Sequence, residues 1–383
     1  MLNRTTVRHL LKQKLAAYLR SCDEKSAPSI VKPKPHQLRI LREYLQKLEL
    51  DANHSACHAV FPLPTGAGKT YLFTLLADLL ATSSGKTVNE LKKETQKTML
   101  SGEQPEASLK TLIIVPTLTL MNQTIENLKV FSPHLKGAKL KSQCDDLEDK
   151  RVGTLDKDSI SCILNNSDVA VVTYQTLLRH YENIPWEKIG IVTLDEAHHA
   201  LSESYVDIIQ KSIMPQDCTI LGFTATPIYN LKRKKKLAGL ASVYELLGYS
   251  EDGHDNPIKA IRVKEAIEEK INCPVVCNRV VIREVENMAA NSSEDISEEK
   301  AARIIDKENY NLILVDLYAN GVSKITGMPF RGKKAVVFCA GIDHSEHVAE
   351  IFNENLCIEN IDPRGFLQTQ YKQIGRASCR ERV

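Results

Sequence analysis

A short segment at residues 64–70 reads Pro-Thr-Gly-Ala-Gly-Lys-Thr and lies between an apolar, β-like run and a helical pattern. Its glycines let the backbone fold tightly, so that successive N–H groups point at one anion, and the positive end of the helix adds to the attraction. The context favours a phosphate-binding loop over a glycine-rich helix entry without a ligand. We expect Lys69 to act in catalysis at the β- and γ-phosphates and the Thr70 hydroxyl to hold magnesium. The nucleotide-binding residues expected here are Thr65, Gly66, Ala67, Gly68, Lys69 and Thr70.

Two acidic residues, Asp195 and Glu196, directly follow an apolar run at residues 189–194. A carboxylate at the carboxyl end of a strand, beside a phosphate loop, is where magnesium needs a second anchor. We therefore expect Asp195 to bind the metal, directly or through water, and Glu196 to orient and deprotonate the attacking water. His198 and His199 are adjacent and would not converge on one metal from a helix. We expect His198 to hydrogen-bond a neighbouring motif and His199 to be structural or exposed.

Two hydroxyl side chains, Thr224 and Thr226, end the next apolar run within Phe-Thr-Ala-Thr-Pro at residues 223–227. Taken alone, this sequence is typical of an ordinary turn at a strand end. Its order and spacing after the acidic pair suggest that both hydroxyls couple to the acidic motif on the neighbouring strand.

The elements that must position these residues alternate between β-like and helical patterns. Short, β-branched, apolar runs predict strands buried on both faces at residues 57–62, 111–116, 169–173, 189–194 and 219–223. Helical patterns cover residues 70–81, 118–131 and 202–213. This alternation predicts an α/β fold with a doubly wound parallel sheet that binds ligands at the carboxyl ends of its strands. We interpret the polar residues 82–110 and 137–168 mainly as surface insertions, and residues 335–340 and 343–353 as a strand and a helix of a second β/α run.

The first 21 residues form a basic amphipathic pattern, with no acidic residue and with apolar residues at helical spacing. Three interpretations stay open for this helix: a packed extension, a surface that faces nucleic acid, and a mitochondrial presequence. Residues 26–35 hold three prolines and predict a linker.

Composition limits the remaining classes. The chain has 383 residues, of which 43% are hydrophobic and 26% charged, as in ordinary globular proteins of two or three domains. No apolar run is long enough for a membrane helix, so we expect no membrane partner. The cysteines are scattered and no secretory signal precedes them, which favours a cytoplasmic location; Cys273 and Cys277 lack a second pair that would complete a zinc site. Residues 374–383 resemble a translated sequencing adapter. Without that tail the numbers of basic and acidic residues are equal, so net charge does not indicate nucleic acid.

The ordered motifs at residues 64–70, 195–198 and 224–227 resemble those of superfamily 2 helicases and translocases. They most resemble the restriction-enzyme-like DEAH branch, which includes type I and type III restriction motor subunits and repair helicases. Residues 115–123 and 335–340 resemble the motifs Ia and IV of this branch. The resemblance covers about residues 31–360 and implies a RecA-like P-loop domain with ATP and Mg²⁺ as cofactors.

The resemblance also implies roles for residues outside the phosphate site. Gln37, in Lys-Pro-His-Gln at residues 34–37, is expected to bind the adenine edge, although Lys and His replace the Arg and the aromatic residue of the family. The nucleic-acid backbone is expected at Pro116, Thr117, Thr173 and Tyr174, for which ordinary turns at strand ends are the alternative. The basic run at residues 232–236 could meet phosphates, form a solvated loop or mimic a nuclear signal.

We therefore expect four segments: a helical extension and linker (1–30), a first RecA-like domain (31–255), the truncated start of a second (256–373) and a non-native tail (374–383). The expected function is that of an ATP-dependent DNA helicase or translocase. RNA helicase activity and an ATP-binding switch or scaffold without translocation are the alternatives. DNA, RNA and the subunits of a restriction or repair complex are the expected partners. The family's second domain supplies an arginine to the reaction, so we expect this chain alone to hydrolyse ATP very slowly. Residues 373–380 echo the arginine motif with wrong spacing, and we assign them no role.

Overall fold

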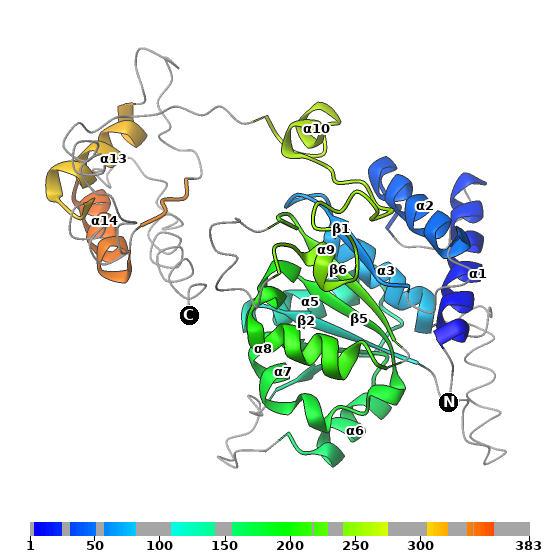
Figure 1. Cartoon of the computed structure of the whole chain (residues 1–383). Coiled ribbons are helices and arrows are strands. Elements are labelled where there is room, and N and C mark those ends of the chain that lie inside the picture. Colours follow the sequence, from blue (N-terminus) through cyan, green and yellow to red (C-terminus); the bar gives the residue numbers. More distant parts are fainter. Residues whose placement is uncertain are drawn as a thin grey trace. The chain divides into compact units, whose positions relative to one another are not determined.

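The computed structural model describes residues 4–24, 31–50, 57–81, 109–141, 155–216, 218–228, 240–274, 305–320, 335–339 and 341–355. The chain divides into two compact units, Met1–Pro274 and Val275–Val383 (Figure 1). The first unit contains the sequence motifs at residues 34–37, 64–70, 115–123, 195–198 and 224–227, whereas the motif-IV-like segment belongs to the second unit.

A sheet of six parallel strands forms the centre of the first unit, in the order β1-β6-β5-β2-β4-β3. The strands are β1 (Ala59–Pro62), β2 (Lys110–Val115), β3 (Gly137–Leu140), β4 (Val169–Thr173), β5 (Ile189–Asp195) and β6 (Thr219–Thr224). The predicted α/β fold with a parallel sheet is confirmed. Each of the five strands predicted in this unit is present, within two residues of its expected bounds.

Strand β3 and helix α6 (Lys157–Asn165) correct the interpretation of residues 137–168 as a surface insertion. The pattern missed β3 because Gly-Ala-Lys-Leu is short and contains no apolar run. As an edge strand beside β4 it buries only Leu140, so its sequence lacks the two-sided apolar signature of the central strands.

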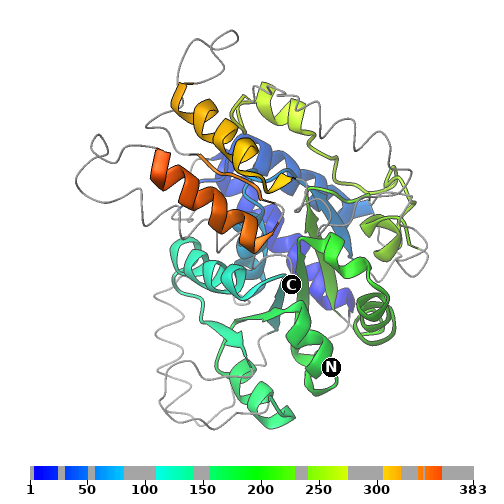
Figure 2. The same cartoon turned by 90° about the vertical axis from the view of Figure 1, so that its left-hand side faces the viewer.

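Helices cover both faces of the sheet (Figure 1, Figure 2). One face packs against α1 (Arg4–Asp23), α2 (Pro35–Leu50), α3 (Lys69–Ala81) and α5 (Leu118–Phe131). The other packs against α6, α7 (Tyr174–His180), α8 (Glu203–Ile208) and α9 (Val243–Leu246). The predicted helix at residues 202–213 is present as α8, continued by a π-helical turn over Ile209–Ile213.

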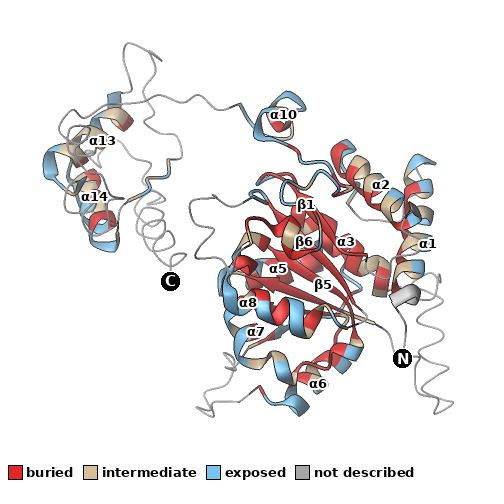
Figure 3. Ribbon diagram, viewed as in Figure 1, coloured by how far each residue is buried: buried red, intermediate tan, exposed pale blue. Residues whose placement is uncertain are grey.

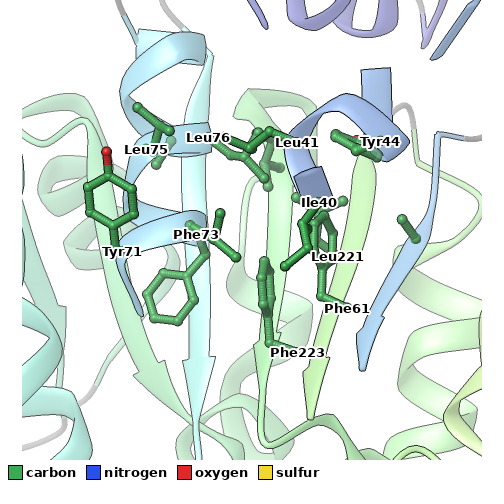
Figure 4. Packing of buried hydrophobic residues seen from close by; sticks show 14 of the residues in the cluster. Ile40, Leu41, Tyr44, Phe61, Tyr71, Phe73, Leu75, Leu76, Leu221 and Phe223 are labelled. Atoms are coloured by element: carbon green, nitrogen blue, oxygen red, sulfur yellow. The ribbon is translucent and has the colours of Figure 1, made fainter. Parts of the chain in front are cut away.

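The central strands are buried along nearly their whole length (Figure 3). Their residues contribute to two different cores, one on each face of the sheet, which explains why these strands read as continuous apolar runs. Thus Ile113 and Ile191 face the first core, and Leu112 and Val192 face the second. In the first core, the rings of Phe61 and Phe223 stack with centroids 4.3 Å apart, and Phe73 and Tyr44 pack edge-on against them (Figure 4). This aromatic packing holds β1 against β6 directly beneath the loops that follow them.

The basic N-terminal helix α1 is packed against the first core. Val7, Leu11 and Leu15 are buried, and the Arg8 guanidinium donates hydrogen bonds to the Leu48 carbonyl at 2.8 and 3.2 Å. That carbonyl lies at the C-terminus of α2, where backbone acceptors lack helical partners. Among the three interpretations of this helix, the structure shows the packed extension.

The chain beyond β6 returns to cover the outer edge of β1. The Asn256 side chain accepts a hydrogen bond from the Val60 N–H at 3.2 Å and donates one to the Val60 carbonyl at 3.0 Å, as a neighbouring strand would. Ile258 and Ile261 enter the first core, and helix α10 (Val263–Glu268) follows. We call residues 256–274 the strap. The first unit therefore extends to Pro274, past residue 255 where we expected its domain to end.

In the second unit, α13 (Glu308–Asn320) and α14 (Ile342–Asn355) pack through Val315, Tyr318, Val348 and Phe352. The helix predicted at residues 343–353 is therefore confirmed. The strand predicted at residues 335–340 is wrong for the part that is described, because Ala335–Cys339 is not paired into a strand and Phe338 is 85% exposed. An apolar run becomes a strand only where a neighbouring strand can pair with it, and the described residues of this unit contain none.

Within the described parts of the chain, we found no helix with the length and apolar character needed to cross a membrane.

Candidate active site

The predicted motifs meet at one edge of the sheet, where β1, β6 and β5 end side by side. In the sheet, Pro62 of β1 lies opposite Thr224 of β6, and Asp195 of β5 lies opposite Phe223 of β6. The Leu63 N–H donates to the Thr224 carbonyl at 2.9 Å and extends this alignment into the glycine-containing loop. Parallel strands therefore bring together side chains that are more than 120 residues apart in sequence.

The loop has the backbone geometry that its glycines predict. Gly66 and Gly68 have φ values of +88° and +84°, in the left-handed region that favours glycine. Helix α3 begins at Lys69, so its N-terminus faces the loop. Thr65 and Gly66 are exposed, whereas Ala67 is buried. An exposed loop at a helix N-terminus presents N–H groups to an anion.

Lys69 and Glu196 form an ion pair, with Lys69 Nζ 2.8 Å from Glu196 Oε1. The Lys69 side chain is 10% exposed and that of Glu196 is 27% exposed, so the pair lies at the floor of the site with the carboxylate towards solvent. Glu196 has φ +45° and ψ +54°, an uncommon conformation for a non-glycine residue. Such local strain is often found at functional sites.

Asp195 lies deeper than its neighbour and is 8% exposed. Burial raises its pKa to about 6, the negative charge of Glu196 adds to the rise, and the charge of Lys69 opposes it. The Glu196 N–H donates to Asp195 Oδ1 at 3.1 Å and fixes the carboxylate. A divalent cation would favour the ionised form that burial disfavours.

The oxygen donors suit magnesium, which binds through one or two protein oxygens together with substrate phosphates and water. The Asp195 carboxylate and the Thr70 hydroxyl are such donors. Among the described residues, no group of three or more His, Cys, Asp or Glu side chains could form a metal cage from protein alone. The two oxygen donors fit a magnesium ion whose other ligands would be phosphate and water.

His198 connects the acidic motif to the end of β6, as we expected from its type. Its Nδ1 lies 3.0 Å from Thr224 Oγ1, 3.4 Å from Thr226 Oγ1 and 3.6 Å from Glu196 Oε2. Burial, followed by the charge of His199, lowers the pKa of His198, which favours a neutral ring. His199 is exposed, and its ring lies 4.5 Å from that of His198.

Gln37 and His36, at the start of α2, both contact the phosphate loop in this structure. His36 Nε2 lies 2.9 Å from the Ala67 carbonyl oxygen, and Gln37 Nε2 donates to the same oxygen at 3.2 Å. The Lys34 N–H donates to Gln37 Oε1 at 2.8 Å. The amide expected at an adenine edge is thus engaged at both ends within the protein.

The four residues expected at nucleic acid have different environments. Thr117 and Thr173 cap α5 and α7, accepting hydrogen bonds from Leu120 N and Thr176 N at 3.2 Å each, and Pro116 is half-buried. Tyr174 is 3% exposed, and its hydroxyl donates to the Asp195 carbonyl at 3.2 Å. A ring this deeply buried stabilises the acidic motif, and almost none of its surface is accessible to a nucleic-acid strand. The basic run at residues 232–236 lies outside the described residues.

The strap contributes residues that the sequence motifs did not indicate. Asn272 Nδ2 donates to the Thr65 carbonyl at 3.2 Å, and Arg39 on α2 pairs with Glu269 at 2.8 Å and Glu265 at 3.4 Å. A cavity of about 440 Å³ lies between strap and loop and is lined by residues that include Thr65, Ala225, Arg262 and Asn272. No local pattern marks Asn272, because its contact depends on a chain return of about 200 residues.

Comparison with known proteins shows a family and several relatives that this chain resembles. The family model "Type III restriction enzyme, res subunit" matches residues 30–229, which is more than half of the chain. The Saccharomyces cerevisiae protein IRC3, whose name describes an ATP-dependent helicase, is 22% identical over 296 residues, covering 76% of this chain and 35% of IRC3. The Yarrowia lipolytica ATP-dependent RNA helicase DBP9 is 34% identical over 139 residues, covering 35% of this chain and 23% of DBP9. The chain spans about a third or less of the length of these curated relatives.

Among solved structures, the type ISP restriction-modification enzyme LlaGI matches with a TM-score of 0.40 and 14% identity, over 91% of this chain and 32% of LlaGI. The UvsW helicase from bacteriophage T4 matches with a TM-score of 0.30 and 22% identity, over 51% of this chain and 54% of UvsW.

Proposed function

Because the chain belongs to the type III restriction enzyme res subunit family, within the superfamily 2 helicases, we propose that it is part of an ATP-dependent helicase or translocase. The observation that carries this proposal is the convergence of Lys69, Asp195 and Glu196 at the ends of β1 and β5. A phosphate loop, a buried carboxylate for the metal and a second carboxylate for water are the parts that hydrolysis of a phosphoanhydride requires.

In the proposed mechanism the loop from Thr65 to Thr70 binds the phosphates of ATP through its N–H groups and the Lys69 ammonium. Asp195 and the Thr70 hydroxyl would hold Mg²⁺, which would supply positive charge against the charge that develops on the phosphates. In the structure, Lys69 forms an ion pair with Glu196. A γ-phosphate that binds the Lys69 ammonium would therefore displace the Glu196 carboxylate from this pair. Glu196 then accepts a proton from the attacking water, whose oxygen bonds to the γ-phosphorus while the bond to the bridging oxygen breaks and ADP leaves.

His198, Thr224 and Thr226 are proposed to transmit the state of this site to the nucleic-acid track. Their hydrogen bonds join the end of β5 to the end of β6, and a shift of Glu196 reaches Thr224 through one histidine. We propose that the sugar-phosphate backbone of the nucleic acid contacts Pro116, Thr117 and Thr173. The buried Tyr174 instead stabilises Asp195, because its hydroxyl donates a hydrogen bond to the Asp195 carbonyl. We keep adenine binding by Gln37 as a proposal, which requires its amide to leave the Ala67 carbonyl.

Duplex DNA is our preferred track and a restriction or repair complex the preferred setting, because the matching family is named for a restriction enzyme. RNA is the second candidate, supported by the DBP9 match, whose name specifies RNA. A cytoplasmic location remains part of the proposal.

Steady-state ATP hydrolysis with duplex DNA, with RNA and with neither separates the candidates. We expect DNA to stimulate turnover in the full-length protein, and Glu196→Gln to abolish the stimulated rate. Stimulation by RNA alone would select the second candidate. Tight ATP binding without stimulated turnover would show a switch or scaffold and would exclude translocation.

A further inference from the structure

The Ala67 carbonyl, at the centre of the phosphate loop, accepts hydrogen bonds from two consecutive residues of α2. His36 Nε2 lies 2.9 Å and Gln37 Nε2 3.2 Å from this oxygen. His36 is 6% exposed and Gln37 is 4% exposed, so both contacts are shielded from water. A carbonyl oxygen can only accept, which assigns the hydrogen of the His36 ring to Nε2.

The environment of His36 does not suit a role in binding the base of a nucleotide. The family resemblance places an aromatic residue here, next to the adenine-binding glutamine. In this chain the ring is buried against the loop backbone, and its polar atom is directed to Ala67. A stacking residue needs a free face, whereas a hydrogen-bonded buried ring fixes the group that it contacts.

Fixing the Ala67 carbonyl also fixes the N–H of the next residue. The described part of the chain contains no cis peptide bond, and in a planar trans peptide the C=O and N–H point in opposite directions. A carbonyl held towards α2 therefore turns the Gly68 N–H away from α2. Gly68 allows this peptide to lie against Gln37, because a Cβ there would come 2.3 Å from Gln37 Nε2.

We propose that His36 is a positioning residue that presets the Ala67–Gly68 peptide for the triphosphate of the nucleotide. This inference rests on the proposed nucleotide-binding function and gives His36 a role in phosphate affinity that does not depend on the base. The ligand class it serves is a polyphosphate chain, with or without a nucleoside. Preset N–H groups bind an anion without the free-energy cost of reorienting the loop.

The test compares the affinities of Mg-ATP and magnesium tripolyphosphate by calorimetry in wild type, His36→Leu and His36→Gln. One neutral hydrogen bond contributes about 0.5–1.5 kcal/mol, so its loss corresponds to a dissociation constant about two- to tenfold higher. We expect His36→Leu to weaken both ligands by this factor. His36→Gln should restore both affinities, because its Nε2 is the same number of bonds from Cβ. His9→Leu, at an exposed histidine on α1, is the matched control and should change neither.

Three results would overturn the proposal. Loss of ATP affinity with unchanged tripolyphosphate affinity would place His36 at the base or ribose, and unchanged affinities for both ligands would leave it no role. Failure of His36→Gln to restore affinity, with a folded protein by circular dichroism, would exclude the hydrogen bond as the cause. If His36→Leu does not fold, a folded His36→Gln variant that binds both ligands more weakly than wild type would still overturn the proposal. Lys69→Ala tests the underlying function separately, because tripolyphosphate binding that survives this change would remove the loop from the site altogether.

Discussion

Lys69 Nζ and Glu196 Oε1 lie 2.8 Å apart and join the loop after β1 to the end of β5. The pair neutralises a nearly buried ammonium, and leaving a buried charge unpaired would destabilise the fold. A phosphate that binds in the loop must replace Glu196 as the partner of Lys69. In the proposed mechanism, this contact would hold the Glu196 carboxylate in place until the nucleotide binds.

Lys69→Ala should reduce ATP turnover of the full-length protein by at least 10³-fold. The phosphates lose the point charge of the loop, and such charge stabilisation contributes several kcal/mol to a phosphoryl transition state. Steady-state hydrolysis at saturating nucleic acid measures the effect, with Lys129→Met on the exposed face of α5 as the control. Turnover within threefold of wild type would show that this loop is not the phosphate site.

Glu196→Gln should separate binding from chemistry. The amide keeps the size of the side chain and can still accept a hydrogen bond from Lys69, but it cannot take the proton of the attacking water. We expect Mg-ATP affinity within about threefold of wild type and hydrolysis lowered by about 10²–10⁴-fold. Equilibrium binding and single-turnover hydrolysis measure the two quantities. A variant that loses affinity as strongly as rate would make Glu196 a metal or structural residue.

Tyr174→Phe should lower the free energy of unfolding by about 1 kcal/mol, because the buried Asp195 carbonyl loses a hydrogen-bond donor. Affinity for nucleic acid should stay within about twofold of wild type, because the ring is buried. Urea denaturation and fluorescence anisotropy measure these quantities. Tyr205→Phe, whose ring packs edge-on against Tyr174 at 5.2 Å, is a control for aromatic packing. If the affinity for nucleic acid falls while the free energy of unfolding is unchanged, the Tyr174 hydroxyl contacts nucleic acid after a rearrangement.

Lys14→Met should make the protein more stable at pH 7, by an amount that shrinks as the pH rises. Burial lowers the pKa of Lys14 to about 8, against the attraction of Asp78. Between pH 8 and about 10.4 the unfolded state binds more protons than the folded state, so the free energy of unfolding rises with pH through this group. The full penalty is present below pH 8, and because the side chain is partly exposed we expect it to be about 1 kcal/mol or less.

Urea denaturation of wild type and Lys14→Met at pH 7, 8, 9 and 10 gives the difference directly. Lys129→Met provides the comparison at an exposed lysine, whose side chain is 65% exposed. A difference between Lys14→Met and wild type that stays constant over this range would show that the variant acts through packing and not through charge.

The amino-acid sequence by itself determined the central strands, the phosphate loop and the acidic motif. A strand buried on both faces requires a continuous apolar run, such as that of β4. The left-handed backbone of the loop favours glycine, which is found at Gly66 and Gly68. These signals are local, because each follows from the conformation or burial of a few consecutive residues. The edge strand β3 was missed since it buries one residue and leaves no such run.

Only the tertiary structure decided which partners the functional side chains contact. Gln37 and His36 meet Ala67, Tyr174 supports Asp195, and the strap reaches Thr65 through Asn272. Each contact joins elements that are between 21 and 207 residues apart, and it depends on how helices pack on the sheet and where the chain returns. A hydrogen-bonding side chain has the same local pattern whether it faces a nucleotide, a nucleic-acid strand or the backbone of its own loop. Packing alone selects among these partners, because it decides which polar atom loses water and must be satisfied within the protein.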